Sequence, residues 1–211
     1  MNIKENYDKQ MQKVISSAEG RPSLLLHSCC GPCSTSVIER LADDFDLTVF
    51  FYNPNIDDEE EYIKRRDNQV KYIEERYGSE NTVKFIEGRY NPEIFLEAAA
   101  PMAEIKEGGE RCRMCFELRL RETASLAAER NFDFFTTTLT VSPMKNASVI
   151  NKIGIETGDE YGVKYLVSDF KKRDGYRRSI ELSREYGLYR QHFCGCRFSV
   201  RETEDDPGQE A

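Results

Sequence analysis

One short stretch, residues 24–34 (LLLHSCCGPCS), restricts the fold of this chain more than any other. Its apolar run, residues 24–26, is too short for an amphipathic helix and suits a central β-strand. A tight loop that carries Cys29, Cys30 and Cys33 follows, and a helical pattern begins directly after it. The stretch therefore predicts a strand–loop–helix unit whose loop is rich in thiols.

The rest of the chain alternates between strand-like and helix-like patterns. Further strands, rich in β-branched and aromatic residues, are predicted at 46–52, 82–86, 132–138 and 165–168. Helices are predicted at 4–19, 34–43, 58–77, 91–100, 113–130, 146–157 and 175–187. This alternation predicts an α/β fold with a parallel sheet flanked by helices. Sites in such sheets form at the carboxyl ends of the strands, where the thiol loop begins.

Length and composition predict a single folded domain. A chain of 211 residues suits one domain, which we place at residues 23–199 after an N-terminal helical segment at 1–22. Residues 200–211 hold five acids and one arginine and are predicted to be a disordered tail. No stretch approaches the roughly 20 apolar residues of a membrane helix, and the polar start lacks a signal-peptide core. We therefore expect a cytoplasmic protein with no membrane partner.

Seven cysteines fall into CCxxC, CxxC and CxC clusters. Cytoplasmic thiols stay reduced, so an odd number of clustered cysteines indicates metal binding or redox catalysis and not a disulfide framework. A helix N-terminus stabilises thiolates, which favours Cys29, Cys30 and Cys33 as ligands or nucleophiles. The alternative, three inert buried cysteines, fits a Gly-Pro loop poorly.

The other two clusters leave more alternatives open. Cys112 and Cys115 lie about one helical turn apart, so they can grip one iron–sulfur cluster or one zinc ion. A thioredoxin-like redox pair is disfavoured because no βαβ strand directly precedes them. Cys194 and Cys196 suit either a strained, easily reduced disulfide or metal ligation, and these two interpretations weigh equally. Spectator surface thiols are the third interpretation.

A few other residues are candidates for the site. His27 and His192 are the only histidines, and a structural hydrogen bond is favoured over metal ligation for each. Asp57 and Asp58 precede a long charged helix, and at least one of them is predicted to cap it. A carboxylate at that edge of the sheet can also reach a metal.

A basic run near the C-terminus could contact phosphates, although the net charge of −8 does not itself indicate a nucleic-acid partner. Two interpretations of this run weigh about equally, a solvated surface and a contact with phosphates. In the second, an aromatic side chain of the run could also stack on a base. The predicted contacts are Lys145, Lys171, Lys172, Arg173, Tyr176 and Arg177.

Several ordered motifs together resemble one known family, the cobalamin-independent epoxyqueuosine reductases (QueH). The matching motifs are HSCCGPCS, FYNPNI, RCRMC, TTTLTVSPMKN, SDFKKRDGY and YRQHFCGC. They span about residues 23–199. The resemblance implies a fold related to the PP-loop ATPase or HUP class, whose phosphate loop is Ser-Gly-Gly-x-Asp-Ser. Cysteines replace those glycines here, so metal chemistry is expected in place of ATP chemistry.

The resemblance also implies the reaction. Epoxyqueuosine at the wobble position of a tRNA is reduced to queuosine with two electrons and two protons, and water leaves. The implied cofactors are a [4Fe-4S] cluster and, as in some members, an additional iron. The implied partners are tRNA carrying epoxyqueuosine and an external electron donor.

Roles for the cysteines follow from the same motif match. Cys29, Cys30, Cys112 and Cys115 match the cluster ligands, and Cys194 and Cys196 match a redox-active pair. Cys33 is implied to hold a second iron or to face the substrate, together with Asp57 or Asp58. Two rival functions remain, an ATP-dependent tRNA-thiolating enzyme of related fold and a non-enzymatic zinc module that docks on RNA.

Overall fold

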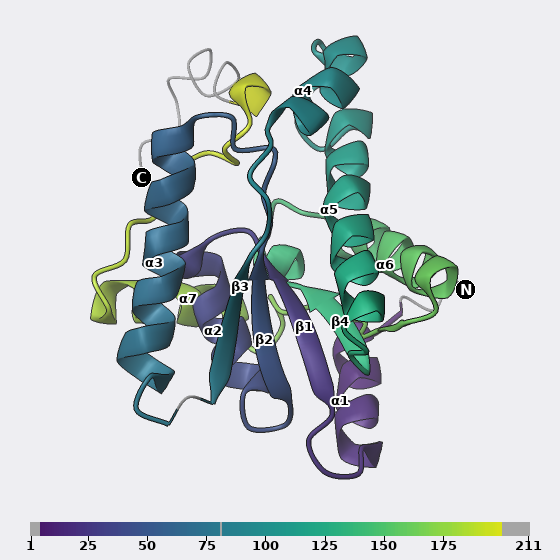
Figure 1. The fold of residues 1–211 in the computed structure, drawn as a ribbon, viewed down its shortest axis with the longest axis vertical. Helices are drawn as coiled ribbons and strands as arrows, with labels where there is room; N and C mark the ends of the chain where they lie inside the picture. The colour runs from purple at the N-terminus through teal and green to yellow at the C-terminus, as the bar shows by residue number, and fades with distance from the viewer. Residues whose placement is uncertain (1–4, 81, 200–211) are drawn as a thin grey trace.

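The five predicted strands form one parallel sheet in the computed structural model, which describes residues 5–80 and 82–199 (Figure 1). Their order in the sheet is β3-β2-β1-β4-β5. The strands are β1 (Ser23–Ser28), β2 (Asp46–Phe51), β3 (Val83–Glu87), β4 (Phe134–Thr137) and β5 (Lys164–Tyr165). The expected α/β architecture, a parallel sheet flanked by helices within a single domain, is confirmed.

Apolar residues on opposite faces of β1 build two separate cores. Leu24 and Leu26 pack into one core, and Leu25 packs into the other, as the period of two in a strand requires. All three leucines are fully buried. The central strand of a parallel sheet is covered on both faces, which explains its continuous apolar run.

Two layers of helices cover these cores, so the sheet lies between them (Figure 1). Helices α1, α2 and α3 bury one face, and α5 and α6 bury the other, while α7 packs against α2. The helices are α1 (Tyr7–Ser17), α2 (Gly31–Leu41), α3 (Glu59–Tyr77), α4 (Glu93–Ala99), α5 (Glu110–Glu129), α6 (Ala147–Tyr161) and α7 (Gly175–Glu185). None of the helices in the described part of the chain combines the length and apolarity needed to cross a bilayer.

Several predicted boundaries shift in ways that matter for the site. Helix α2 begins at Gly31, three residues before the predicted start, so Cys33 lies within its first turn. Helix α5 begins at Glu110, which puts both cysteines of the CxxC motif inside the helix. The segment between β4 and α6 opens with a 3₁₀ helix, η2 (Thr138–Val141), whose four residues are buried. Strand β5 has only two residues, and directly beyond it the Leu166 N–H donates to the Phe135 carbonyl at 2.9 Å while the Leu166 carbonyl accepts from Thr136 Oγ1 at 2.8 Å.

The order of the strands creates a crevice at one place. Chain connections leave β1 and β4, which are neighbours, toward opposite faces of the sheet. Open parallel sheets bind their ligands at such a point, beyond the carboxyl ends of the strands. The thiol loop after β1 and the 3₁₀ helix after β4 meet there, where the Cys29 N–H donates to Thr138 Oγ1 at 3.2 Å.

Candidate metal centre

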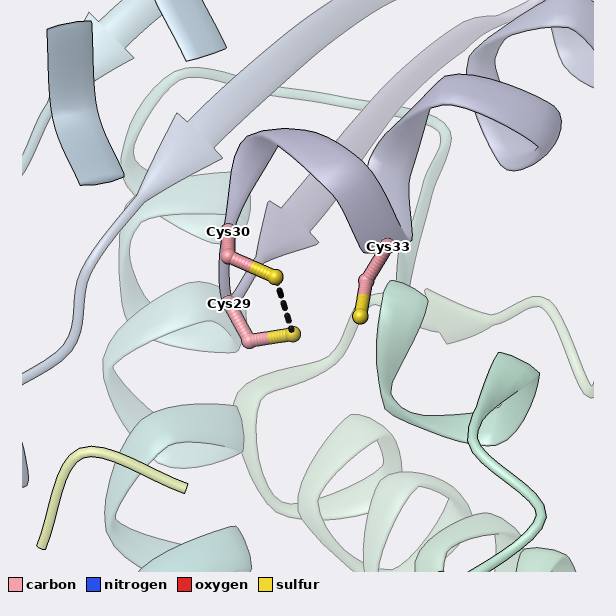
Figure 2. Close-up of side chains that lie close together, drawn as sticks. All are labelled: Cys29, Cys30 and Cys33. Carbon is pink, nitrogen blue, oxygen red and sulfur yellow. Dashed lines mark hydrogen bonds between the residues drawn. The ribbon is translucent and has the colours of Figure 1, made fainter. Parts of the chain in front are cut away.

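Three thiols gather at the N-terminus of α2. Their sulfur atoms lie within 4.8 Å of one another, and the Cys29 and Cys30 sulfurs are 3.9 Å apart (Figure 2). Cys30 caps the helix with extended backbone, and Pro32 occupies its first turn. Gly31 is required here because a Cβ would lie 3.0 Å from the Asn68 backbone of α3. The local sequence thus turns the chain tightly and brings all three sulfurs to one side.

The three thiols share their protons unequally. Hydrogen bonds from Cys30 and Cys33 hold the pKa of the Cys29 thiol well below its usual range. Hydrogen bonding to Cys29 conversely raises the pKa of Cys30 to about 12 and raises that of Cys33. One thiolate flanked by two thiols is a group prepared to bind a cation that displaces the remaining protons.

Neighbouring loops fix the orientation of these sulfurs. Thr138 Oγ1 lies 3.5 Å from the Cys29 sulfur, and Gln191 Nε2 lies 2.8 Å from the Cys30 sulfur. Beneath them, Ser28 donates to Gln69 at 2.5 Å and its carbonyl accepts from Asn53 at 2.8 Å. Polar side chains from four segments therefore hold the thiol loop in place.

The remaining four cysteines form a second group. Cys115 and Cys196 are buried in one small cluster with Phe95 of α4. Burial raises the pKa of the Cys115 thiol to about 12 and raises that of Cys196. Cys112 is half-buried, and its sulfur accepts the Gly108 N–H at 3.2 Å. The raised pKa values keep the Cys115 and Cys196 thiols protonated unless a cation replaces their protons.

Two adjoining cavities connect the two groups. One, the Cys112 chamber, has a volume of about 160 Å³ and is lined by Cys112, Cys115, Cys194 and Cys196. The other, the Cys29 chamber, has a volume of about 290 Å³ and is lined by Cys29, Cys33 and Cys194. Cys194 belongs to both walls, so it stands between the two thiol groups. The structure thus brings six of the seven cysteines to two cavities that share part of their walls, and the sulfur of the seventh, Cys30, lies 3.9 Å from that of Cys29.

Two cations also belong to both walls. They are Arg119 of α5, which is 1% exposed, and Lys145, which precedes α6 and is half-buried. The charge of Cys194, followed by those of Cys29 and Cys33, raises the pKa of Lys145. Lys145 was predicted to hold tRNA phosphates, and the structure places its ammonium among thiols.

Side chains from two other parts of the chain hold the CxC segment, residues 194–196, in place. Arg65 of α3 donates to the carbonyls of Cys194 at 3.2 Å and Phe193 at 3.3 Å, and its guanidinium carbon lies 5.0 Å from the centre of the Phe193 ring. Asn55 Nδ2 adds a third contact, 3.4 Å from the Cys194 carbonyl. Gly195, between the two cysteines, has a φ of +98°, in the region that favours glycine.

The two histidines occupy different places. Both ring nitrogens of His27 are hydrogen-bonded, to Thr137 Oγ1 at 2.8 Å and to the Tyr52 carbonyl at 3.1 Å. Burial lowers the pKa of His27 to about 3, so the ring is neutral. This is the structural role that was favoured for it. His192 is exposed on the wall of the Cys29 chamber.

The two aspartates after β2 lie outside both chambers. Asp58 caps α3, as predicted for one of the pair, and accepts the Glu61 N–H at 2.8 Å. Asp57 forms an ion pair with Arg197, one residue after the CxC motif. Both line a separate surface groove with Lys64 and Gly195. The structure therefore connects Asp57 to the CxC segment through Arg197, with no direct contact to a thiol.

Most of the basic run is paired with acids of the same chain. Lys171 contacts Asp169 at 2.6 Å, Arg173 contacts Asp8 at 3.1 Å and Arg177 contacts Glu181 at 3.2 Å. Lys172 is exposed and has no ion pair among the described residues. Tyr176 is 37% exposed on the wall of the Cys29 chamber. The run is thus less positive than its sequence indicates, and Lys172 and Tyr176 are its most available members.

Sequence reasoning missed three residues of the site. Arg119 follows Cys115 by four residues, a spacing that places both on one helix face and was the available signal. Gln191 and Arg65 contact the thiol loop and the CxC segment, respectively. No local pattern marks either residue, because each is brought to the site by contacts between segments more than 120 residues apart.

The donor set fits an anionic iron–sulfur cofactor. Thiolates are the ligands that such clusters prefer, and the thiol loop and helix α5 offer cysteines to the two adjoining cavities. Arg119 and Lys145 supply positive charge at the same walls. A nucleotide fits less well, because thiols occupy the position at the end of β1 where glycines would cradle phosphates.

Comparisons with known proteins show the family to which the chain belongs. The model of the family described as "Epoxyqueuosine reductase QueH" matches residues 24–202. A protein of that description from Streptococcus pyogenes is 44% identical over 209 residues, which cover 95% of this chain and 80% of the relative. Another, from Staphylococcus epidermidis, is 44% identical over 94% of this chain and 86% of its own length.

A solved structure supports the fold class. The U34-tRNA thiolase NcsA from Methanococcus maripaludis, determined with its [4Fe-4S] cluster, has a TM-score of 0.51 and 14% identity to this chain. The match covers 96% of this chain and 72% of the thiolase, and at this identity it shows a common fold alone. Extensive identity to the named reductases carries the classification: the chain belongs to the epoxyqueuosine reductase family QueH, a family of oxidoreductases.

Proposed function

We propose that the protein reduces epoxyqueuosine in tRNA to queuosine with an iron–sulfur cluster bound among the thiols of its two chambers. The observation that supports this proposal best is that six cysteines and two cations line two adjoining cavities at the carboxyl edge of the sheet. Cys29, Cys30, Cys112 and Cys115 are the proposed ligands of a [4Fe-4S] cluster. Cys33 is the proposed ligand of an additional iron.

The reaction needs two electrons and two protons for each epoxide, and it releases water. When bound, the cluster and the additional iron supply electrons and a Lewis acid for the epoxide oxygen. Cys194 and Cys196 form the proposed redox pair, because two thiols that become a disulfide release the same two electrons and two protons. Arg65 and Asn55 hold Cys194 at the wall common to both chambers. Asp57 is the proposed support of this pair through Arg197.

The substrate is proposed to enter the Cys29 chamber. A modified base must leave its stack to reach a buried site, and Tyr176 on the chamber wall offers a ring for stacking. Met144 is 81% exposed on the same wall and offers a second apolar contact. Lys145, Lys171, Lys172, Arg173 and Arg177 are proposed to complement the charge of the tRNA. A cytoplasmic location, where thiols stay reduced, completes the proposal.

Metal and sulfide analysis of anaerobically purified protein tests this function. We expect a brown protein that absorbs near 400 nm, contains iron and acid-labile sulfide, and reduces epoxyqueuosine-containing tRNA with a chemical reductant and no cobalamin. A colourless protein with one zinc ion would instead favour the RNA-docking module. A requirement for ATP would favour the thiolating enzyme.

Replacing Lys172 by alanine tests the tRNA contact. Because this lysine is exposed and unpaired among the described residues, we expect weaker tRNA binding and a salt dependence lower by about one ion. Filter binding or fluorescence anisotropy across a series of salt concentrations measures both. Lys13→Ala, on the exposed side of α1, is the matched control. Equal affinity and salt slope for the two variants would place the tRNA elsewhere.

A further inference from the structure

Arg119 is a buried cation with no acidic partner. Its side chain is 1% exposed, and it forms no ion pair with a carboxylate in residues 5–80 or 82–199. Among the described residues, the one hydrogen bond of its side chain runs from Nε to the Cys115 carbonyl at 3.2 Å, one turn back along its own helix. Nη2 is buried without a hydrogen-bond partner among the described residues.

Thiols surround this guanidinium on several sides. Cys112, Cys115 and Arg119 lie at i, i+3 and i+7 of α5 and therefore share one helix face. Arg119 also lines both chambers. Cys194 lines both of them with it, and Cys29 lines the Cys29 chamber. Arg119 is thus the only residue of the CxxC helix that reaches the walls of both chambers in the described structure.

A cation in this position is costly unless something negative faces it. A guanidinium cannot lose its proton in a protein, and a buried charge without a partner is strongly destabilising. Among the described residues no ion pair balances the charge of Arg119, so the group that would balance it is an anion bound in the two chambers that it lines.

We propose that Arg119 is the counter-cation of the iron–sulfur cluster, a positioning residue that stabilises the bound cluster and favours its reduced state. The inference rests on the proposed function. A cluster with four thiolate ligands is an anion and becomes more negative on reduction, so a fixed neighbouring cation stabilises the reduced form more than the oxidised form. Lys145 adds a second positive charge at the walls of both chambers.

Reduction potential is the first readout. In Arg119→Met, we expect the midpoint potential of the bound cluster, followed by its absorbance in a redox titration, to become more negative. Arg119→Lys retains the charge and should restore most of the potential. Arg121→Met is the matched control, because Arg121 lies on the same helix and pairs with Glu160 at the surface at 2.5 Å. An unchanged potential in Arg119→Met would overturn the inference.

Thermal stability with and without the cluster is the second readout. Without metal, Arg119→Met should be at least as stable as the native protein, because an apolar side chain replaces an uncompensated buried charge. With the cluster bound, the same variant should melt at a lower temperature and lose iron faster to a chelator. A metal-free variant that is less stable than native, or does not fold, would show that Arg119 serves the fold itself and overturn the inference.

The two proposals fail differently. If the native protein binds neither iron nor sulfide, the proposed function fails and the inference fails with it. If the native protein binds the cluster and Arg119→Met matches it in potential and iron retention, only the inference fails.

Discussion

We expect the replacement of Cys112 by alanine to abolish cluster binding and to lower the rate of epoxide reduction by more than about 100-fold. Loss of an outer hydrogen-bond partner already costs about 10–100-fold in metal affinity or activity, and removal of a direct ligand costs more. Cys29→Ala should behave in the same way, since the proposed cluster has ligands from both the thiol loop and helix α5. Iron and sulfide content, absorbance near 400 nm and turnover measure the loss.

Cys33→Ala distinguishes this ligand set from its nearest alternative. The sulfurs of Cys29, Cys30 and Cys33 lie within 4.8 Å of one another. The alternative is therefore that these three cysteines alone bind the cluster. If Cys112 and Cys115 complete the cluster instead, Cys33→Ala keeps the absorbance of the four-iron cluster while it loses the additional iron and activity. The reverse pattern, with absorbance retained in Cys112→Ala and lost in Cys33→Ala, would reject the proposed ligands.

The fold was predictable because its signals are local and repeated. Strands of four or more residues, bounded by turns and alternating with helical patterns, restrict the topology to a parallel sheet. The end of β1 was predictable as a site for the same reason, since the sheet determines where the following loop opens. The two-residue β5 escaped accurate placement because its neighbours in β4 position it, with little contribution from its own sequence.

The polar surroundings of the site were less predictable. A charged residue in a helix is ordinarily assigned to its solvated face, so Arg119 was given no role, although its spacing from Cys115 was an available signal. Lys171, Arg173 and Arg177 looked like a free basic surface, but their acidic partners include Asp8, which lies more than 160 residues away from Arg173. Sequence specifies which charges exist, whereas the tertiary fold decides which of them neutralise one another.

The CxC segment illustrates the same division between local and tertiary information. A glycine between two cysteines gives the backbone unusual freedom, and Gly195 uses it with a φ of +98°. What the sequence did not reveal is that the glycine also packs tightly. A Cβ at this position would lie 2.8 Å from Ile56 Cγ1 and 3.0 Å from Arg65 Nη1.

Gly195→Ala is therefore expected to displace the CxC segment from its wall. Both neighbours of the added methyl are about 98% buried or more, so neither can move away easily. The unfavourable φ costs about 1–3 kcal/mol, and overpacking adds about 1–3 kcal/mol. Because only a few hydrogen bonds from Arg65 and Asn55 hold this segment, the strain is relieved locally, and reductase activity should fall at least about tenfold.

Thiol labelling locates the effect of this substitution. In the metal-free protein, Cys194 and Cys196 should react with iodoacetamide faster in Gly195→Ala than in the native chain, and mass spectrometry can follow each site separately. Gly187→Ala is the matched control, since Gly187 has a φ of +55° and only Lys71 Nζ within 4 Å of an added Cβ. It carries backbone strain without a clash and lies outside both chambers, so its labelling and activity should remain near native. If Cys196 in Gly195→Ala reacted as slowly as in the native chain, contacts other than those of Arg65 and Ile56 would hold the segment. The packing of Cys196 against Phe95 and Cys115 would then be the contact that holds it.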